Sequence, residues 1–226
     1  MHNASPPVPS RAVATTIASL IAMWFVAALV MSCSGRFQTA PDQPPLAFGL
    51  TLSIPLVLAI VSYAAVPGVR LVARSLDLNL VTALHLGRIV GSDFILLWLQ
   101  HRLPALFALP AGLGDITIAL TTLPLIWAMR RQTPGVRTRF VIWNVLGIVD
   151  LVVALGMGVL NAQGPLGVLA GSGPTTVLMS AYPRALIPTF FVPFYILLHL
   201  AALTRRAEVG SPASPAAPRA QVVAAR

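Results

Sequence analysis

The segment from Leu78 to Gln100, LNLVTALHLGRIVGSDFILLWLQ, is an almost continuous run of apolar residues that also contains Arg88 and Asp93. A helix needs about 20 predominantly apolar residues to cross the hydrocarbon core of a bilayer, which is about 30 Å thick. The segment has this length, and lipid offers no partner to the backbone groups of an open chain. It is therefore predicted to be a membrane-spanning helix with charged side chains inside it.

Five further segments have the same length and apolar character. With the first, they give predicted spans at 12–33, 46–66, 78–100, 103–129, 140–160 and 185–203. The chain of 226 residues is 57% hydrophobic and 9% charged, whereas a soluble domain carries about 25% charged residues. The sequence lacks the alternating pattern of a membrane β-barrel. The fold class is therefore predicted to be all-α, a polytopic transmembrane helical bundle with six spans.

The distribution of arginines predicts the orientation of the bundle. With the N-terminus in the cytoplasm, three arginines lie on the periplasmic side, namely Arg36, Arg102 and Arg184. Eleven then lie on the cytoplasmic side: Arg11, Arg70, Arg74, Arg130, Arg131, Arg137, Arg139, Arg205, Arg206, Arg219 and Arg226. Cytoplasmic loops are enriched in Lys and Arg, so an N-in/C-in protein of the bacterial inner membrane is expected. This topology accounts for the net charge of +9, and no nucleic-acid partner is expected.

The segments around the spans complete the predicted organisation. Residues 1–11 are expected to form a flexible cytoplasmic lead, 12–204 the six-helix domain, and 205–226 a disordered tail rich in Ala, Pro and Ser. Residues 67–77 are expected to be a cytoplasmic loop. The connection 161–182 is apolar but broken by Gly and Pro, so it is predicted to be either a loop packed on the surface or a lid or re-entrant segment. Pro188 and Pro193 are expected to kink the last span.

The chain has a single cysteine, Cys33, which excludes a disulfide within the chain and a cysteine-based zinc site. It follows Val30-Met31-Ser32 at the end of the first span, a pattern that distantly resembles a lipoprotein cleavage site. The first apolar run is longer than that of a usual signal peptide, which favours an uncleaved helix. No metal-binding spacing is present, and no cofactor is expected.

Four charged residues inside the spans are the candidate functional site: Arg88, Asp93, Asp115 and Asp150. A charge at the centre of a bilayer costs roughly 2.5–3.5 kcal/mol, so such residues should face one another or a wet cavity. At about 1.5 Å per residue, Arg88, Asp115 and Asp150 lie near mid-membrane, and Asp93 lies about a turn nearer the periplasm. Arg88 is expected to meet Asp115 or Asp150, because Asp93 lies about 140° away around the helix.

Two functional hypotheses follow from this cluster of charges. Three carboxylates against one guanidinium leave a surplus of negative charge, so one aspartate should be protonated or a cation should be bound. In the first hypothesis the protein binds or transports a small solute or ion with proton coupling. Arg88 then neutralises or binds an anion, and Asp115 and Asp150 exchange protons or a cation. In the second, a non-catalytic structural or accessory subunit uses the network to fix helix register. A homo-oligomer is expected because the protein is small.

The run Gly112-Leu113-Gly114-Asp115 resembles the GxGD signature of intramembrane aspartyl proteases and prepilin peptidases. This resemblance covers four residues and implies a membrane hydrolase in which a second aspartate on the preceding span completes a catalytic dyad. Asp93 occupies that position, and two carboxyls sharing a proton would activate water. Ser92 stands where the family usually has an aromatic residue or leucine. The later proline-alanine-leucine motif of the family is missing, which puts the resemblance in doubt.

Two histidines, His85 and His199, are predicted at similar depth on the third and sixth spans. Facing imidazoles at one level could ligate a haem iron. The alternative is that both are hydrogen-bonded core residues. On the fifth span, Asn144, Gly147 and Asp150 form a stripe of polar and small residues.

Overall fold

The computed structural model describes residues 9–40 and 42–210, and every regular element in these ranges is helical. Six helices are long and apolar enough to cross a membrane: Arg11–Cys33, Leu46–Ala65, Leu78–Leu99, Ala105–Arg130, Val136–Leu160 and Ile187–Thr204. The predicted helices are thus confirmed, with bounds that differ by a few residues. Of the expected lead and tail, residues 1–8 and 211–226 lie outside the described residues.

Four of the six long helices are regular over their whole length. They are α1 (Arg11–Cys33), α2 (Leu46–Ala65), α6 (Ala105–Arg130) and α7 (Val136–Leu160). The third consists of α4 (Leu78–Leu84), a 3-10 segment η1 (His85–Gly91) and α5 (Ser92–Leu99). The last begins with a π-helical turn η3 (Ile187–Phe191) and continues as α8 (Val192–Thr204). Pro188 lies in the first turn of η3 and Pro193 lies in the first turn of α8. The helical hydrogen bonding changes from π to α between these two prolines.

One predicted loop is a helix. Residues 67–77 were expected to be irregular, but α3 spans Pro67–Ser75. Proline is favoured in the first turn of a helix because its missing N–H has no intrahelical acceptor there. Asp77 then caps α4 by accepting a hydrogen bond from the Asn79 N–H at 2.7 Å. This bond holds the pKa of the Asp77 carboxyl below its ordinary value.

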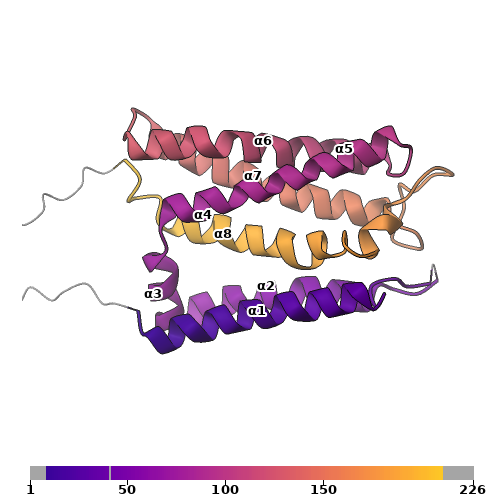
Figure 1. The fold of residues 1–226 in the computed structure, drawn as a ribbon, viewed down its shortest axis with the longest axis horizontal. Helices are drawn as coiled ribbons and strands as arrows, with labels where there is room; N and C mark the ends of the chain where they lie inside the picture. The colour runs from indigo at the N-terminus through magenta and orange to yellow at the C-terminus, as the bar shows by residue number, and fades with distance from the viewer. Residues whose placement is uncertain (1–8, 41, 211–226) are drawn as a thin grey trace, which may run out of the picture.

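The helices form two groups that lie side by side (Figure 1). The four spans from α4 to α8 make a bundle in which α6 packs against η1, α5 and α7, and α7 packs against α8. The α1–α2 hairpin lies along one side of this bundle and meets it through η3 and α8. Helix α3 lies across one end and joins the hairpin to the bundle, and both ends of the described chain lie at this same end.

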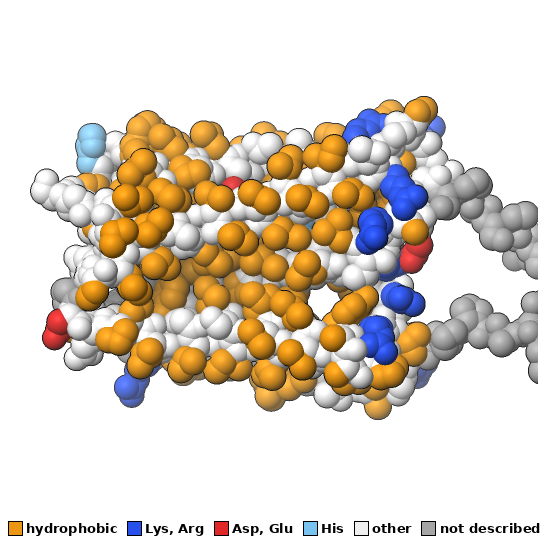
Figure 2. All heavy atoms as spheres, turned by 180° about the vertical axis from the view of Figure 1, so that it is seen from behind, with side chains coloured by type: hydrophobic (Ala, Val, Ile, Leu, Met, Phe, Trp, Pro, Cys, Tyr) orange, Lys and Arg blue, Asp and Glu red, His pale blue; other side chains and the backbone are white. Residues whose placement is uncertain are grey.

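The buried residues are concentrated in the four-span bundle. One apolar cluster surrounds Phe140 and Trp143 near the end that carries the termini. A second surrounds Phe94 and Phe107. The outer surface is largely hydrophobic along its length, and arginines gather at the end that carries the termini (Figure 2). The bundle therefore has an apolar exterior and a core that contains buried polar groups.

The connection 161–182 packs at the end of the bundle opposite the termini (Figure 1). Its short 3-10 helix η2 (Thr176–Ser180) is tied to the end of α7, because the Thr176 hydroxyl donates to the Gly158 carbonyl at 2.6 Å. The Leu169 N–H also donates to the Leu160 carbonyl at 2.8 Å. The segment is thus a packed loop, and it does not run back between the helices.

Candidate functional site

The 3-10 geometry of η1 aligns three buried residues, His85, Arg88 and Gly91. A 3-10 helix has three residues per turn, so positions three apart lie directly above one another. The line faces α6, α7 and α8. In a continuous α-helix, positions three apart would be rotated relative to one another around the helix axis. The 3-10 geometry in the middle of the span therefore directs the side chains of His85 and Arg88 into the bundle.

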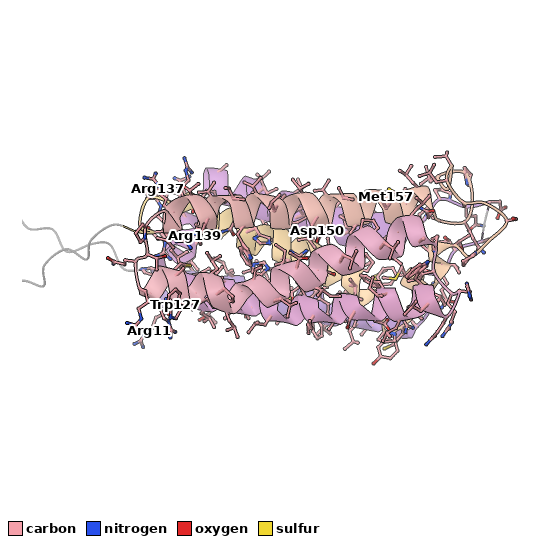
Figure 3. The ribbon with its side chains drawn as sticks, turned by 90° about the horizontal axis from the view of Figure 1, so that it is seen from above. Arg11, Trp127, Arg137, Arg139, Asp150 and Met157 are labelled. Atoms are coloured by element: carbon pink, nitrogen blue, oxygen red, sulfur yellow. The ribbon has the colours of Figure 1, made fainter. Side chains whose placement is uncertain are left out.

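Arg88 forms ion pairs with carboxylates from two other helices. Its Nε donates to Asp115 Oδ1 on α6 at 2.6 Å, and its Nη2 donates to Asp150 Oδ2 on α7. The Arg88 side chain is 1% exposed, whereas those of Asp115 and Asp150 are 14% and 15% exposed. Asp150 lies about midway along the bundle (Figure 3). The structure therefore brings together three of the four predicted site residues, at the centre of the long axis.

The Nη1 group of Arg88 also contacts the protein. Its Nη1 lies 3.4 Å from the Gly147 carbonyl oxygen and 3.3 Å from His199 Nε2. The Asn144 amide donates to the Phe140 carbonyl at 2.8 Å, so its oxygen accepts from His199 Nδ1 at 2.9 Å. Because Nδ1 carries the proton, Nε2 accepts from Arg88 and the ring is neutral. A chain of hydrogen bonds thus runs from Asn144 through His199 to Arg88.

Three glycines allow this close approach of side chains. A Cβ at Gly91 would overlap Asp115, and one at Gly114 would overlap the Asp150 carboxylate. A Cβ at Gly147 would overlap the imidazole of His199. Each glycine therefore makes room for a member of the cluster on a neighbouring helix.

The cluster carries one net negative charge when both aspartates are ionised. Arg88 is its single cation among the described residues, since His199 is neutral. Each carboxylate uses one oxygen on Arg88. In the described part of the chain, the other oxygens, Asp150 Oδ1 and Asp115 Oδ2, accept no hydrogen bond. An uncompensated charge in a low-dielectric interior is costly, and binding of one proton or cation removes that cost.

Asp93 does not join the cluster, which corrects the expected four-residue site. Its carboxylate pairs with Arg184 in the segment before η3, with Nε to Oδ2 at 2.7 Å and Nη2 to Oδ1 at 3.3 Å. The two side chains are 35% and 26% exposed. Asp93 and Asp115 are thus held by different arginines, and no hydrogen bond joins them within residues 9–40 and 42–210. This geometry does not fit the shared proton of a GxGD-type dyad.

His85 and His199 lie together but do not fit the haem hypothesis. Their rings stack directly, with centroids 4.0 Å apart and an interplanar angle of 28°. Axial ligands would have to lie on opposite faces of a flat macrocycle, and stacked rings leave no space for one. Both nitrogens of His199 are also engaged by Asn144 and Arg88. The two histidines are instead core residues, surrounded by Trp143 and Tyr195.

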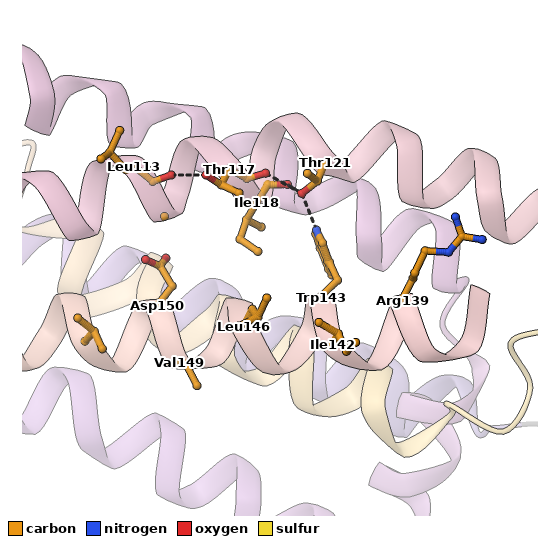
Figure 4. Close-up of a pocket in the computed structure, with 12 residues that line it drawn as sticks. Leu113, Thr117, Ile118, Thr121, Arg139, Ile142, Trp143, Leu146, Val149 and Asp150 are labelled. Carbon is orange, nitrogen blue, oxygen red and sulfur yellow. Dashed lines mark hydrogen bonds between the residues drawn. The ribbon is translucent and has the colours of Figure 1, made fainter. Parts of the chain in front are cut away.

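A shallow groove of about 570 Å³ lies between α6 and α7 on the outside of the bundle (Figure 4). It runs from Arg139 past Trp143 and Leu146 to Asp150 and Val153. Apolar side chains form most of its surface. The hydroxyls of Thr117 and Thr121 donate to backbone carbonyls, and the Thr121 oxygen accepts from Trp143 Nε1 at 2.9 Å. Asp150 therefore connects the buried cluster to the groove.

Residues 45–205 match the family described as a domain of unknown function, DUF8737. The chain belongs to this family. The matched range includes every member of the cluster and the groove, and it begins after α1. No curated protein and no solved structure matches the chain.

Some members of the site were harder to find from sequence than others. Asn144, Gly147 and Asp150 stand out in the sequence as a stripe on α7, and all three contact the cluster, but only Asp150 was predicted to meet Arg88. The partner of Asp93 was missed, because Arg184 is 91 residues away in the chain and was assigned to the end of a span. His199 was noticed as a polar core residue, but its bond to Arg88 depends on tertiary packing.

Proposed function

We propose that the protein is a multi-pass protein of the bacterial inner membrane with both termini in the cytoplasm. The apolar exterior and the six long helices support insertion. The arginines at the end that carries the termini support the orientation, because positive residues are retained in the cytoplasm.

Cys33 offers a direct test of this topology. It is an exposed, free cysteine at the end of α1 opposite the termini. In intact cells with a permeable outer membrane, a membrane-impermeant maleimide should label Cys33. In a Cys33→Ser background, Ser75→Cys at the end of α3 should react only after the inner membrane is opened. The reverse pattern would refute the orientation, and equal labelling of both sites would refute insertion.

We further propose that the Arg88–Asp115–Asp150 cluster binds one exchangeable proton or cation, and that this exchange is coupled to binding or transport of a small solute or ion. The observation that carries the proposal is the sharing of one buried guanidinium by two carboxylates. Proton binding neutralises the pair, and proton release restores one negative charge. Intramembrane carboxylates of this kind commonly belong to proton relays and ion pathways.

Arg88 acts in this proposal as a fixed counter-ion. All of its bonded donors contact protein groups, namely two carboxylates, a carbonyl and an imidazole. The guanidinium is also buried, with the Arg88 side chain 1% exposed, so an anion has little access to it. Exchange therefore takes place at the carboxylates, whose free oxygens are the accessible part of the cluster.

Infrared difference spectroscopy across the neutral pH range tests the exchange. A neutral carboxylic acid has a carbonyl stretch that an ionised carboxylate lacks, so the wild-type protein should show a titrating band. Asp115→Asn and Asp150→Asn should each abolish it, because each variant leaves one carboxylate for one guanidinium. Asp93→Asn is the matched control and should retain it. A wild-type protein without the band, or a band unchanged in both cluster variants, would refute the proposal.

A structural role is the second candidate function. The near-complete burial of Arg88 and its contacts with three other helices favour it, because such a network can fix helix register without turnover. A purely structural cluster predicts no titrating carboxyl and a loss of folded protein for both cluster variants, Asp115→Asn and Asp150→Asn. The same set of variants therefore separates the two functions.

A further inference from the structure

We propose that the groove between α6 and α7 binds an amphiphilic organic cation, whose positive group lies at Asp150 and exchanges there with the proton of the cluster. This inference rests on the proposed function and names the class of solute. In this proposal, a lipid-soluble cation and a proton compete for the carboxylate of Asp150.

The position of Asp150 in the groove is the first argument. Its Oδ2 is bound to Arg88, and Oδ1 is the oxygen that a Cβ at Gly114 would overlap. Gly114 itself forms part of the groove wall. The absence of a side chain at this position therefore leaves a carboxylate oxygen, without a donor in the described part of the chain, at the inner end of an apolar groove (Figure 4).

Charge complementarity is the second argument. The cluster has one negative charge more than positive charges, and Asp150 is the member of the cluster that lines the groove. A bound cation removes this surplus in the same way as a proton does. An anion would add a further negative charge, and a neutral molecule would leave the surplus in place.

The shape and chemistry of the groove require the rest of the ligand to be apolar. The walls beside Asp150 are formed by Leu113, Leu146 and Val149, each at least half exposed. Trp143 and both threonines already use their polar atoms within the protein. A hydrated inorganic cation would find one carboxylate and few other polar partners here, whereas an organic cation would bury its apolar surface.

The position of the groove indicates how the ligand arrives. Asp150 follows Arg139 by eleven positions on α7, which is roughly 16 Å of helix, or about half the hydrocarbon thickness. Arg139 closes the surface end, where its Nη2 donates to Thr133 Oγ1 at 2.8 Å and to the Pro134 carbonyl at 2.7 Å. A cation is repelled at that end. It therefore reaches Asp150 from the side, out of the bilayer.

Binding of tetraphenylphosphonium to the full-length protein in lipid nanodiscs tests the inference. A saturable component should weaken as the pH is lowered, because protons compete for Asp150. Asp150→Asn should weaken it by about tenfold or more, since a charged partner is lost. Leu146→Trp should weaken it similarly by filling the groove. Leu120→Trp is the matched control, because Leu120 is 66% exposed on α6 and outside the groove.

The infrared titration of the carboxyl band tests the proposed function, and cation binding tests the further inference, so the two can fail independently. Leu146→Trp should reduce cation binding while leaving the titrating carboxyl band unchanged. A normal band in the wild-type protein without saturable cation binding would overturn this inference alone. Binding that is unchanged in both Asp150→Asn and Leu146→Trp would overturn it as well. So would saturable binding of an anionic amphiphile, dodecyl sulfate, that depends on Arg139 and is insensitive to Asp150→Asn.

Discussion

The α1–α2 hairpin and the bundle from α4 to α8 are both built from helices that are apolar enough to cross a membrane, but the two groups differ in how much of each helix is buried. In the most apolar 18-residue window of each helix, 11% of residues in α1 and none in α2 are buried, compared with 28% to 50% in the four spans of the bundle. The bundle also contains the buried ion pairs, whereas α1 meets it through aromatic contacts to Phe190 and Phe191, and α2 packs against η3 and α8.

This difference shows that hydropathy places a helix in a membrane but does not decide what it packs against. In the membrane location that we propose, the charged and hydrogen-bonded groups that join the bundle would have few alternative partners in lipid. The exposed apolar side chains of the hairpin would be solvated by lipid tails as well as by protein. We therefore expect the stability of the fold to depend on the cluster far more than on the hairpin, and four predictions test this contrast.

The largest effect is expected from the double variant Asp115→Asn/Asp150→Asn. It leaves Arg88 buried without a carboxylate, and breaking a buried pair in this way costs about 3–5 kcal/mol. Each single variant should cost clearly less, because the other carboxylate still pairs with Arg88. Thermal unfolding and folded yield in detergent measure the three variants. Equal losses in the single and double variants would contradict this expectation. They would show that the remaining carboxylate in a single variant does not stabilise the buried Arg88.

The close approach between α7 and α8 is tested by Gly147→Ala, which places a methyl group against the His199 ring. Forcing extra volume into a packed core costs typically about 1–3 kcal/mol. Gly156→Ala is the matched control on the same helix, because nothing lies within 4 Å of a Cβ at that position. The control should be neutral or slightly stabilising, since alanine is the better helix former. Similar unfolding temperatures for both variants would contradict the tight packing.

A smaller and local effect is expected for the hairpin. Trp24 Nε1 donates to the carbonyls of Thr51 and Thr189, each at 3.2 Å, and so joins α1 to α2 and to η3. Trp24→Phe keeps the ring but removes this donor, at a cost of about 0.5–1.5 kcal/mol. Amide exchange should quicken in α1 and α2 and stay unchanged in α6 and α7. Met23→Leu, at a position that is 62% exposed, is the control. Exchange that quickened in the core as well would show that the hairpin supports the bundle.

The smallest effect is expected at the end of the bundle, for Asp93→Asn. Its pair with Arg184 is partly exposed, and solvent screening limits such pairs to about 0–1 kcal/mol. The loss should shrink further at high salt, which screens exposed charges. Asp42→Asn, an exposed acidic position in the α1–α2 loop, serves as the control. A loss as large as that of the double cluster variant would show that this pair is a second buried site.

The parts of the fold that depend on local pattern could be predicted from sequence. The six helices follow from length and hydropathy. Depth and helical phase predicted that Arg88 meets Asp115 or Asp150, and the structure pairs it with both. The 3-10 geometry of η1 and the Asp93–Arg184 pair were not predicted. Both depend on tertiary contacts between segments that are far apart in the chain, and the pattern within a single helix does not predict such contacts. The alignment of the two histidines in depth was predicted, but their direct stacking excludes the haem hypothesis.

The fixed tautomer of His199 makes this ring a spectroscopic reporter inside the cluster. Its Nδ1 proton is held by Asn144, and its Nε2 accepts from the same guanidinium that serves both carboxylates. When a carboxylate gains a proton, Arg88 loses part of one ion pair and its bond to Nε2 changes with it. In a chain with four histidines, the resonance of Nε2 in protein enriched in nitrogen-15 would register the charge state of the pair without a dye or a known solute.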